Sequence, residues 1–356
     1  MATPFLSVLI DTYNHERFIE KAILSALEQD FPAADREILV VDDGSTDGTE
    51  KIVRKFEPHV RLLRKMNGGQ ASAFNAGIPE CKGEILAFLD GDDWWARHKL
   101  ARVVQAMTGD RAVGIVGHGI VVVGRDGGEQ SEILREGFHF QANTIEGANL
   151  FRRRGAFLGT SRMTIRAELL RRIGAVPEGI KIQADEYLFT LASVLAEAQI
   201  LPEALTYYRL HDANSFQLAE RPEPEKLRQK QTSLATLAKT LSQKLDDLGI
   251  DEQVIETVLE FTRLSADQLR LVLDGGWPWE TTKTEWRLYR ILHPDARFSH
   301  RLFKGMVLMG ALVTTPKIYY GIQRSLAQSD YYRRARKRWL PVPEMEHIQK
   351  ERRAGS

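Results

Sequence analysis

The chain has 356 residues, of which 43% are hydrophobic and 27% charged, a composition typical of a protein with a packed core. This length favours two domains over one larger domain. A formal net charge of +1 argues against a protein that binds nucleic acid by bulk electrostatic attraction. The single cysteine, Cys81, excludes an intrachain disulfide, and the N-terminus lacks the basic and apolar regions of a signal peptide. We therefore expect a cytoplasmic protein.

Apolar runs of strand length alternate with helical patterns in the first hundred residues. The runs are FLSVLI, EILVV, VRLLRK and EILAFL, at residues 5–10, 37–41, 60–65 and 84–89. The segment RFIEKAILSALEQ, between the first two, repeats its apolar residues at helical spacing. This alternation predicts an α/β fold with a Rossmann-like, mostly parallel central sheet and helices on both of its faces.

The pattern changes twice along the rest of the chain. The Val- and Gly-rich segment at 111–140 contains the turn sequence RDGGE and predicts a β-hairpin or meander. From about Glu223, leucines recur at helical spacing, and GGWPW at 275–279 interrupts the pattern. We expect one domain at 1–220, with halves at about 1–110 and 111–220, and an α-helical extension at 221–356.

Polar clusters follow three of the apolar runs. DTYN follows the first, DDGSTD the second and DGDD the fourth. Ligands of such sheets bind at the carboxyl ends of the strands, so we expect the three clusters to meet in one crevice. Asp43 could accept hydrogen bonds there from a nucleobase or a ribose. The alternative is a strand-to-helix loop without a ligand, because Asp-Gly-Ser is common turn chemistry.

The stretch LDGDDWW at 89–95 crowds three carboxylates together. Asp90 and Asp92 are separated only by Gly91, so both can reach one side of a tight turn. Oxygen ligands of this kind suit Mg²⁺ or Mn²⁺. The alternative is a solvated Asp-Gly turn. We expect Asp93 to cap a helix formed by the WWARHKL segment that follows.

Taken together, these motifs carry a resemblance to a known family. Thr-Tyr-Asn, Asp-Asp-Gly-Ser-Thr-Asp, Asn-Gly-Gly with a downstream Asn-Ala-Gly, and Leu-Asp-Gly-Asp-Asp occur in this order, at residues 12–14, 42–47, 67–77 and 89–93. YYRLHDANS follows at 207–215. The sequence resembles the GT-A fold glycosyltransferases of family 2 over about residues 5–216. In this resemblance, 1–110 is the nucleotide-sugar half and 111–220 the acceptor half.

The resemblance implies an inverting, metal-dependent transferase. It would move a sugar from a nucleotide-diphosphate donor, a UDP-sugar above all, to a hydroxyl of a saccharide or lipid-linked acceptor. Guanine and thymine remain open as the base. Surface polysaccharide or glycolipid synthesis is the implied setting, and Mn²⁺ or Mg²⁺ the cofactor.

Individual residues take roles from the same resemblance. Asp92 is expected to bind the metal directly, with Asp90 beside it. His211 is expected at the diphosphate or the metal. The expected donor-binding residues are Thr12, Tyr13, Asp43, Asp90, Gly91 and His211.

The general base is expected in QADEYLFTLAS at 183–193. Matching Leu188 and Phe189 to the family's Leu-Trp pair assigns the base to Asp185, with Glu186 as its rival because the usual acid before the base is Ala184 here. The alternative is the first turn of a helix, where acids are favoured by the helix dipole. The preceding segment at 155–166 is expected to border the acceptor pocket.

The segment at 300–340 mixes an apolar run, tyrosines and a basic cluster at 333–338. A peripheral membrane contact and helix packing, on the catalytic domain or in a homo-oligomer, both fit this composition.

Two other functions are weaker. A nucleotidyltransferase usually has a Gly-rich phosphate loop and a basic residue near its N-terminus, which DTYNHERF does not provide. A non-catalytic nucleotide-sugar-binding scaffold has no need of intact acids at Asp43, Asp90, Asp92 and Asp185.

Overall fold

The computed structural model describes residues 5–134, 136–154, 159–180, 182–211, 224–294, 296–328 and 346–348. The chain divides into two compact units. The N-terminal unit comprises Met1–Leu150, Arg154–Gln217 and Glu346–Ser356, and the C-terminal unit comprises Phe151–Arg153 and Leu218–Met345. The boundary that we expect near residue 220 lies outside the described residues and stays a prediction.

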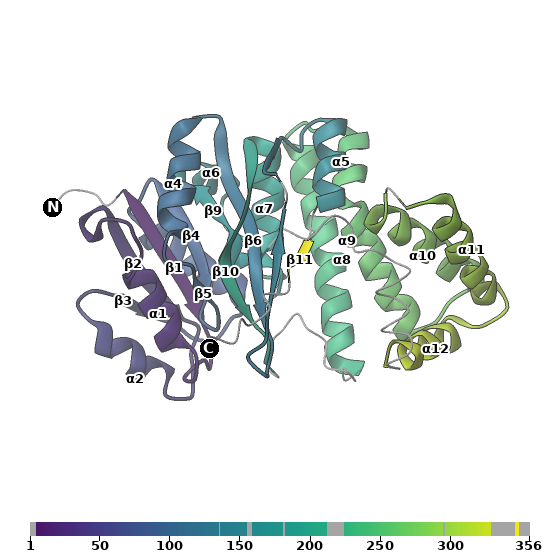
Figure 1. The fold of residues 1–356 in the computed structure, drawn as a ribbon, viewed down its shortest axis with the longest axis horizontal. Helices are drawn as coiled ribbons and strands as arrows, with labels where there is room; N and C mark the ends of the chain where they lie inside the picture. Colours follow the sequence, from purple (N-terminus) through teal and green to yellow (C-terminus); the bar gives the residue numbers. More distant parts are fainter. Residues whose placement is uncertain are drawn as a thin grey trace, which may run out of the picture. The chain divides into compact units, whose positions relative to one another are not determined.

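The N-terminal unit is built on one mixed sheet (Figure 1), and its main path runs β11-β7-β6-β9-β4-β1-β2-β3. The long strand β10 lies off this path and pairs with β5, β6 and β8. The strands in the described residues are β1 (Leu6–Thr12), β2 (Arg36–Asp42), β3 (Arg61–Arg64), β4 (Ile85–Asp90), β5 (Trp94–Trp95), β6 (Val113–Val123), β7 (Glu129–Ile133), β8 (Phe138–Phe140), β9 (Thr164–Arg166), β10 (Glu197–Arg209) and β11 (Glu346–Ile348).

The four strands predicted from the first apolar runs form the parallel part of the sheet. β1 lies in the middle and pairs in parallel with β2 and β4, and β2 pairs in parallel with β3. The side chains of β1 and most of those of β2 and β4 are buried on both faces, which is why these three runs are apolar without alternation, whereas β3 at the edge of the sheet is partly exposed. The register aligns Thr12 with Asp42 and Asp11 with Asp90. The polar strand ends therefore meet at one edge, as predicted.

Helices cover both faces of this parallel part. On one face, α1 (Ile19–Leu27), α2 (Thr49–Val53) and α4 (Lys99–Gly109) share a buried apolar cluster with β1, β2 and β4. On the other face, α3 (Gln70–Gly77) packs Phe74 against Phe88 of β4, with ring centroids 5.2 Å apart. The predicted α/β fold class is confirmed.

The second half of this unit carries the antiparallel additions. β6 and β7 form the predicted hairpin, antiparallel between Ile120–Val123 and Glu129–Glu132. The helices of this half are α5 (Ile145–Arg154), α6 (Ala167–Ile173) and α7 (Ala184–Leu195). A short 3₁₀ turn at Thr160–Arg162 precedes β9.

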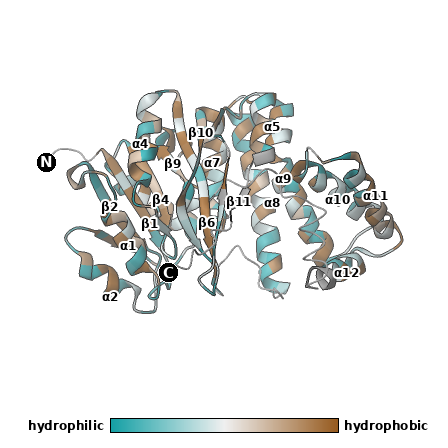
Figure 2. Cartoon of the chain, viewed as in Figure 1, coloured by the Kyte–Doolittle hydropathy of each residue, from teal (hydrophilic) through white to brown (hydrophobic). Residues whose placement is uncertain are grey.

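The C-terminal unit is helical, as predicted. Its described helices are α8 (Pro224–Asp247), α9 (Glu252–Leu273), α10 (Pro278–Leu292), α11 (Phe298–Leu312) and α12 (Pro316–Gln328). Figure 2 shows hydrophilic and hydrophobic residues alternating along α8 and α9, and the leucines of α8 at 234, 237, 241 and 245 are buried. None of the helices in the described ranges is long and apolar enough to cross a membrane.

Candidate active site

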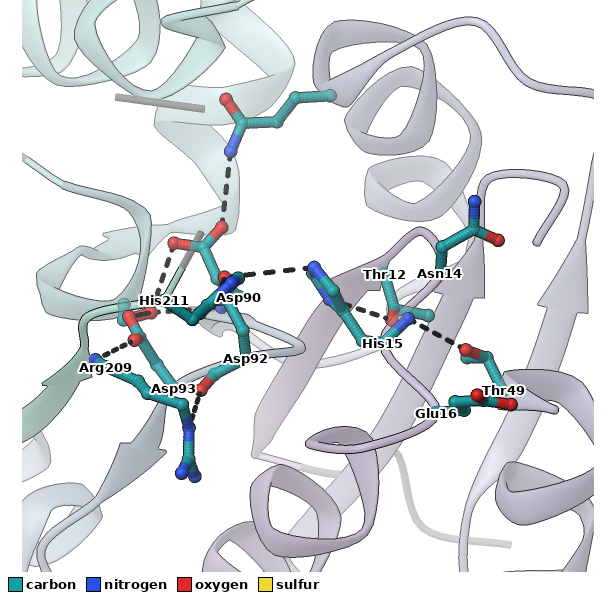
Figure 3. Close-up of polar contacts among 12 residues, drawn as sticks. Thr12, Asn14, His15, Glu16, Thr49, Asp90, Asp92, Asp93, Arg209 and His211 are labelled. Atoms are coloured by element: carbon teal, nitrogen blue, oxygen red, sulfur yellow. Dashed lines mark hydrogen bonds and ion pairs between the residues drawn. The ribbon is translucent and has the colours of Figure 1, made fainter. Parts of the chain in front are cut away.

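A cluster of carboxylates lies where β1 and β4 end (Figure 3). Asp90, Asp92 and Asp93 each offer an oxygen, and these oxygens lie within 4.8 Å of one another. Asp11 is the register partner of Asp90 on the neighbouring strand. Oxygen ligands at such spacing suit Mg²⁺ or Mn²⁺. The two aspartates predicted as metal ligands are therefore brought together, with two further acids beside them.

Asp92 is the acid of this cluster that the surroundings hold in its charged form. His211 Nε2 lies 2.8 Å from Asp92 Oδ2, and His15 Nε2 lies 3.8 Å from the same oxygen. Burial acts to raise the pKa of Asp92, but the His211 hydrogen bond and the charges of both histidines outweigh it and lower the pKa. An ionised carboxylate is the form that binds a cation.

The neighbouring acids are destabilised as anions. Burial, reinforced by the charges of Asp11 and Asp92, raises the pKa of Asp90 well above its usual range. Burial and the charge of Asp92 raise the pKa of Asp11 to about 8. In the described part of the chain, the buried Oδ1 of Asp11 has no hydrogen-bond partner. A divalent cation would stabilise crowded carboxylates of this kind and would provide a partner for Asp11 Oδ1. The chemistry of these residues therefore fits a metal site.

Gly91 is required by the close approach of two loops. A Cβ at this position would lie 2.6 Å from Thr12 Oγ1 and 2.9 Å from His15 Nδ1. Thr12 Oγ1 and His15 Nδ1 are themselves hydrogen-bonded at 3.2 Å. The absence of a side chain at Gly91 therefore lets the end of β1 contact the turn that carries Asp90 and Asp92.

Asp93 does not cap a helix, and that prediction is wrong. Trp94 and Trp95 form β5, which pairs with β10, and α4 begins only at Lys99. The Asp93 carboxylate is buried and accepts hydrogen bonds from Ser161 Oγ at 2.7 Å and from the backbone N–H of Arg209 at 3.0 Å. These partners, distant in the sequence, hold Asp93 inside the domain and fasten the acidic turn to β10.

Asp43 organises the loop at the end of β2. Its carboxylate accepts hydrogen bonds from Lys65 Nζ at 2.6 Å and from the backbone N–H of Gly69 at 2.7 Å. Gly44 adopts φ 80°, and a Cβ there would lie 2.8 Å from the backbone nitrogen of Asn67. The loop is thus held in place, and nucleobase binding by Asp43 stays a prediction.

The DTYN loop is held by the loop after β2. Asn14 adopts φ 56°, and its Oδ1 accepts a hydrogen bond from the backbone N–H of Thr46 at 2.8 Å. The residue before α1 is Phe18, without a side-chain cap. Tyr13 is 43% exposed, so its ring is free to stack on a ligand. The prediction that Tyr13 and Thr12 bind the donor is untested.

Asp185 is linked to Asp90 of the carboxylate cluster through the 3₁₀ turn and Gln70. Asp185 Oδ2 accepts a hydrogen bond from the backbone N–H of Thr160 at 3.1 Å. Gln70 Nε2 donates to Thr160 Oγ1 at 2.9 Å and to Asp90 Oδ1 at 3.3 Å. Burial raises the pKa of Asp185, although hydrogen bonds from the N–H groups of Glu186 and Thr160 act to lower it.

Glu186, the rival for the base, makes a different contact. Its Oε2 accepts a hydrogen bond from Gln183 Nε2 at 3.0 Å, whereas Asp185 is the acid bonded to Thr160. Both acids lie in the first turn of α7, so the dipole interpretation holds for both. Residues 155–158, part of the predicted acceptor border, lie outside the described residues.

Ser161 is a site residue that the motifs did not identify. Its Oγ donates to Asp93 and accepts a hydrogen bond from the backbone N–H of Asp90 at 3.0 Å. Its carbonyl oxygen accepts hydrogen bonds from Lys99 Nζ at 2.8 Å, Trp95 Nε1 at 3.0 Å and Thr206 Oγ1 at 2.6 Å. Ser161 therefore ties β4, β5, α4 and β10 together behind the carboxylates.

Arg209 is the second residue that was not assigned to the site. Its Nε donates to the carbonyl oxygen of Asp92 at 3.0 Å, and its guanidinium lies 4.5 Å from the ring centroid of Trp94 and 4.9 Å from that of Phe18. Cation–π contacts of this kind hold the guanidinium in place. Arg209 lies in the YYRLHDANS segment, but its aromatic contacts come from residues that are distant in the sequence.

Comparison with known proteins agrees with this geometry. Residues 7–174 match the family model "Glycosyl transferase family 2". This match identifies residues 7–174 as a glycosyltransferase family 2 domain. The uncharacterized glycosyltransferase alr2836 of Nostoc sp. is 29% identical over 317 residues, which cover 82% of this chain and 95% of the relative. The chain is therefore a glycosyltransferase, and the match covers nearly the whole length of this relative.

Two solved structures share the fold. TarS 1–349 of S. aureus, crystallised with UDP-GlcNAc, superposes with a TM-score of 0.54 at 18% identity, covering 86% of this chain and 90% of that chain. The mannosyltransferase PcManGT of Pyrobaculum calidifontis, in complex with GDP-Man and Mn²⁺, gives 0.54 at 20% identity, covering 95% of this chain and 84% of that chain. The predicted GT-A fold is confirmed.

Proposed function

We propose that this family 2 glycosyltransferase catalyses metal-dependent, inverting transfer of a sugar from a nucleotide-diphosphate donor, a UDP-sugar above all, to a hydroxyl of a saccharide or lipid-linked acceptor. The observation that carries the proposal is the link from Asp185 through Thr160 and Gln70 to Asp90, which lies in one carboxylate cluster with Asp92. Surface polysaccharide or glycolipid synthesis is the proposed setting.

Asp92 and Asp90 are the proposed ligands of Mn²⁺ or Mg²⁺. A bound cation would offset the charge that develops on the departing diphosphate. The lowered pKa of Asp92 and the unpartnered Asp11 Oδ1 support this assignment. The Mn²⁺ and GDP-Man bound to PcManGT support it by analogy of fold. His211, through its contact with Asp92, is proposed to orient that ligand and to reach the diphosphate.

Asp185 is the proposed general base. In an inverting reaction, a base removes the proton of the acceptor hydroxyl as its oxygen attacks the anomeric carbon, and the bond to the diphosphate breaks on the opposite side. A carboxylate with a raised pKa is a stronger base than a solvated one, and burial raises the pKa of Asp185. Thr160 keeps Asp185 in position by donating its backbone N–H.

The donor nucleotide is proposed to bind along the ends of β1 and β2. Tyr13 would stack on the base, Asp43 and Thr12 would contact the base or ribose, and Asp90 with the Gly91 backbone would line the diphosphate side. UDP and UDP-GlcNAc bound to TarS support a UDP-sugar, and GDP-Man bound to PcManGT leaves guanine open.

The division into domains and the cellular location complete the proposal. We propose 1–220 as the catalytic domain and 221–356 as an extension that brings the enzyme to the cytoplasmic face of a membrane through residues 300–340. A lipid-linked acceptor would be presented at such a surface.

A screen of donors tests this function. Purified enzyme is incubated with UDP-, GDP- and dTDP-sugars, with Mn²⁺, Mg²⁺ or chelator, and the released nucleoside diphosphate is measured. We expect metal-dependent release from a UDP-sugar. Formation of pyrophosphate from a nucleoside triphosphate and a sugar phosphate would instead identify a nucleotidyltransferase. Metal-dependent binding without turnover, in the presence of acceptor extracts, would identify a scaffold protein.

A further inference from the structure

Helix α11 exposes a stripe of large apolar side chains. Within the C-terminal unit, only Leu308 and Ala311 of the helix are buried. The stripe consists of Phe298, Leu302, Met306 and Met309 of the helix and of Val313, which directly follows it; they are spaced by three or four residues, and each is more than half exposed. Side chains at this spacing lie on one face of a helix, so the stripe is a continuous apolar ridge.

Helix α12 continues this apolar character. Ile318 and Ile322, one turn apart, are 54% and 51% exposed. Tyr319 and Tyr320 of α12 pack with Leu308 and Ala311 into the same buried cluster, so the two helices are neighbours. A soluble surface rarely leaves so many large apolar residues in water without a partner.

The charged side chains of the segment that carries the stripe are all basic. Residues 296–328 contain five Lys and Arg and no Asp or Glu, whereas residues 224–294 of the same unit contain eleven Asp and Glu. Lys304 is paired with Glu285 at 3.1 Å, but Arg297, Arg301 and Lys317 are exposed. In the sequence, Arg333, Arg334, Arg336, Lys337 and Arg338 follow, outside the described residues.

We propose that the stripe and the α12 pair Ile318 and Ile322 form a docking surface for an anionic lipid bilayer. Apolar side chains would enter the interface while the basic side chains contact lipid phosphates, which is how amphipathic helices lie on membranes. This surface deepens the membrane location proposed above and rests on that proposal.

Charge decides between a bilayer and a second copy of the chain. A two-fold contact places the same patch on both sides, so Arg297, Arg301 and Lys317 would face their own copies. No acid within 296–328 could pair with them. Like charges at a protein interface are unfavourable, whereas an anionic headgroup layer supplies the opposite charge.

Vesicle sedimentation of the full-length protein tests the docking surface. Vesicles of phosphatidylcholine alone are compared with vesicles containing about one third phosphatidylglycerol, a content at which each basic residue near the surface strengthens binding about fivefold. The variant carries Leu302→Gln, Met306→Gln and Met309→Gln. The matched control carries Leu24→Gln, Ile145→Gln and Phe261→Gln, which change exposed apolar residues of other helices.

We expect the unaltered protein and the control to sediment with the anionic vesicles, and binding to pure phosphatidylcholine to be weaker by at least about tenfold. The variant should lose at least about tenfold in partitioning, because each half-exposed side chain contributes about fivefold. Thermal unfolding of all three proteins checks that they are folded.

Equal partitioning of the variant and the unaltered protein would overturn the proposal, as would equal binding to both kinds of vesicle. Self-association that the variant abolishes, without vesicle binding, would assign the surface to a second copy. Donor cleavage measured without lipid separates this result from the proposed function. Cleavage that persists when vesicle binding fails would refute the docking surface alone.

Discussion

Replacing Asp185 by Asn separates its proposed chemical role from its structural one. The carboxylate accepts hydrogen bonds from the N–H groups of Thr160 and Glu186, at 3.1 and 2.9 Å. The amide of Asn keeps one acceptor oxygen but turns its NH₂ toward the other donor, which costs about 1–3 kcal/mol. Loss of the buried charge offsets part of this cost, because burial raises the pKa of Asp185. We therefore expect a change in unfolding free energy of no more than about 2 kcal/mol.

The expected effect on turnover is larger. Removing a general base typically lowers the rate by about 10²- to 10⁴-fold, which corresponds to about 2.7–5.4 kcal/mol of transition-state stabilisation. Nucleotide affinity should be unchanged, because Asp185 is assigned to the acceptor hydroxyl. The assays are steady-state transfer, calorimetric titration with UDP and chemical unfolding.

Glu186→Gln is the matched control, since it removes the neighbouring acid and should retain most of the activity. In the unaltered enzyme, kcat/KM should rise with pH through a pKa above the ordinary value of Asp, because the base works only when ionised. Near-normal transfer by Asp185→Asn, with a large loss in Glu186→Gln, would refute the assignment and move the base to Glu186.

Three further predictions concern the carboxylate cluster and its support. In the folded protein, the pKa values of Asp11, Asp90 and Asp185 are raised above the ordinary 3.8, to about 8 for Asp11. The contribution of these groups to stability is therefore greatest below pH 3.8 and is lost as the pH rises through the raised pKa values. Without metal, the melting temperature should therefore fall between pH 5 and 8, and Mn²⁺ should raise it more at pH 8; a flat profile would contradict this. Ser161→Ala should lower the unfolding free energy by about 1–3 kcal/mol per lost partner, because Asp93 loses a hydrogen-bond donor and the N–H of Asp90 loses its acceptor. Urea unfolding measures this, and an unchanged midpoint would contradict the stabilising role of Ser161. Gly91→Ala should cost about 1–3 kcal/mol through overlap with Thr12, and a fully stable variant would show that the two loops can separate.

The sequence was sufficient for the parts of the fold that rest on local pattern. Three apolar runs without alternation predicted β1, β2 and β4, because parallel strands covered by helices are buried on both faces. The polar residues at their ends predicted where the site lies, since the register of β1 with β2 and β4 brings those ends to one edge.

Roles that depend on distant partners could not be predicted. Asp93 matched the composition of a helix cap, but its partners Ser161 and Arg209 lie 68 and 116 residues away in the sequence. The same applies to Gln70, whose amide joins Asp90 to Thr160 across 20 and 90 residues. Side-chain networks of this kind follow from tertiary packing, which leaves no fixed spacing in the sequence.

For the exposed stripe on α11, the sequence identified the segment but left its role open. The sequence identified an apolar and basic segment but could not separate membrane contact from packing, because both bury a helical stripe. Only the observed exposure of Phe298, Met309 and Val313 indicates which side of the helix is left without a partner in the described residues.

Calorimetric titration of the enzyme with UDP, in Mn²⁺ and in chelator, tests the central claim most directly. If Asp92 and Asp90 hold a cation that contacts the diphosphate, UDP should bind at least about tenfold more tightly with Mn²⁺, a difference of about 1.4 kcal/mol. The Asp92→Asn variant should bind UDP weakly under both conditions. Equal affinity of the unaltered enzyme with Mn²⁺ and with chelator would contradict the account.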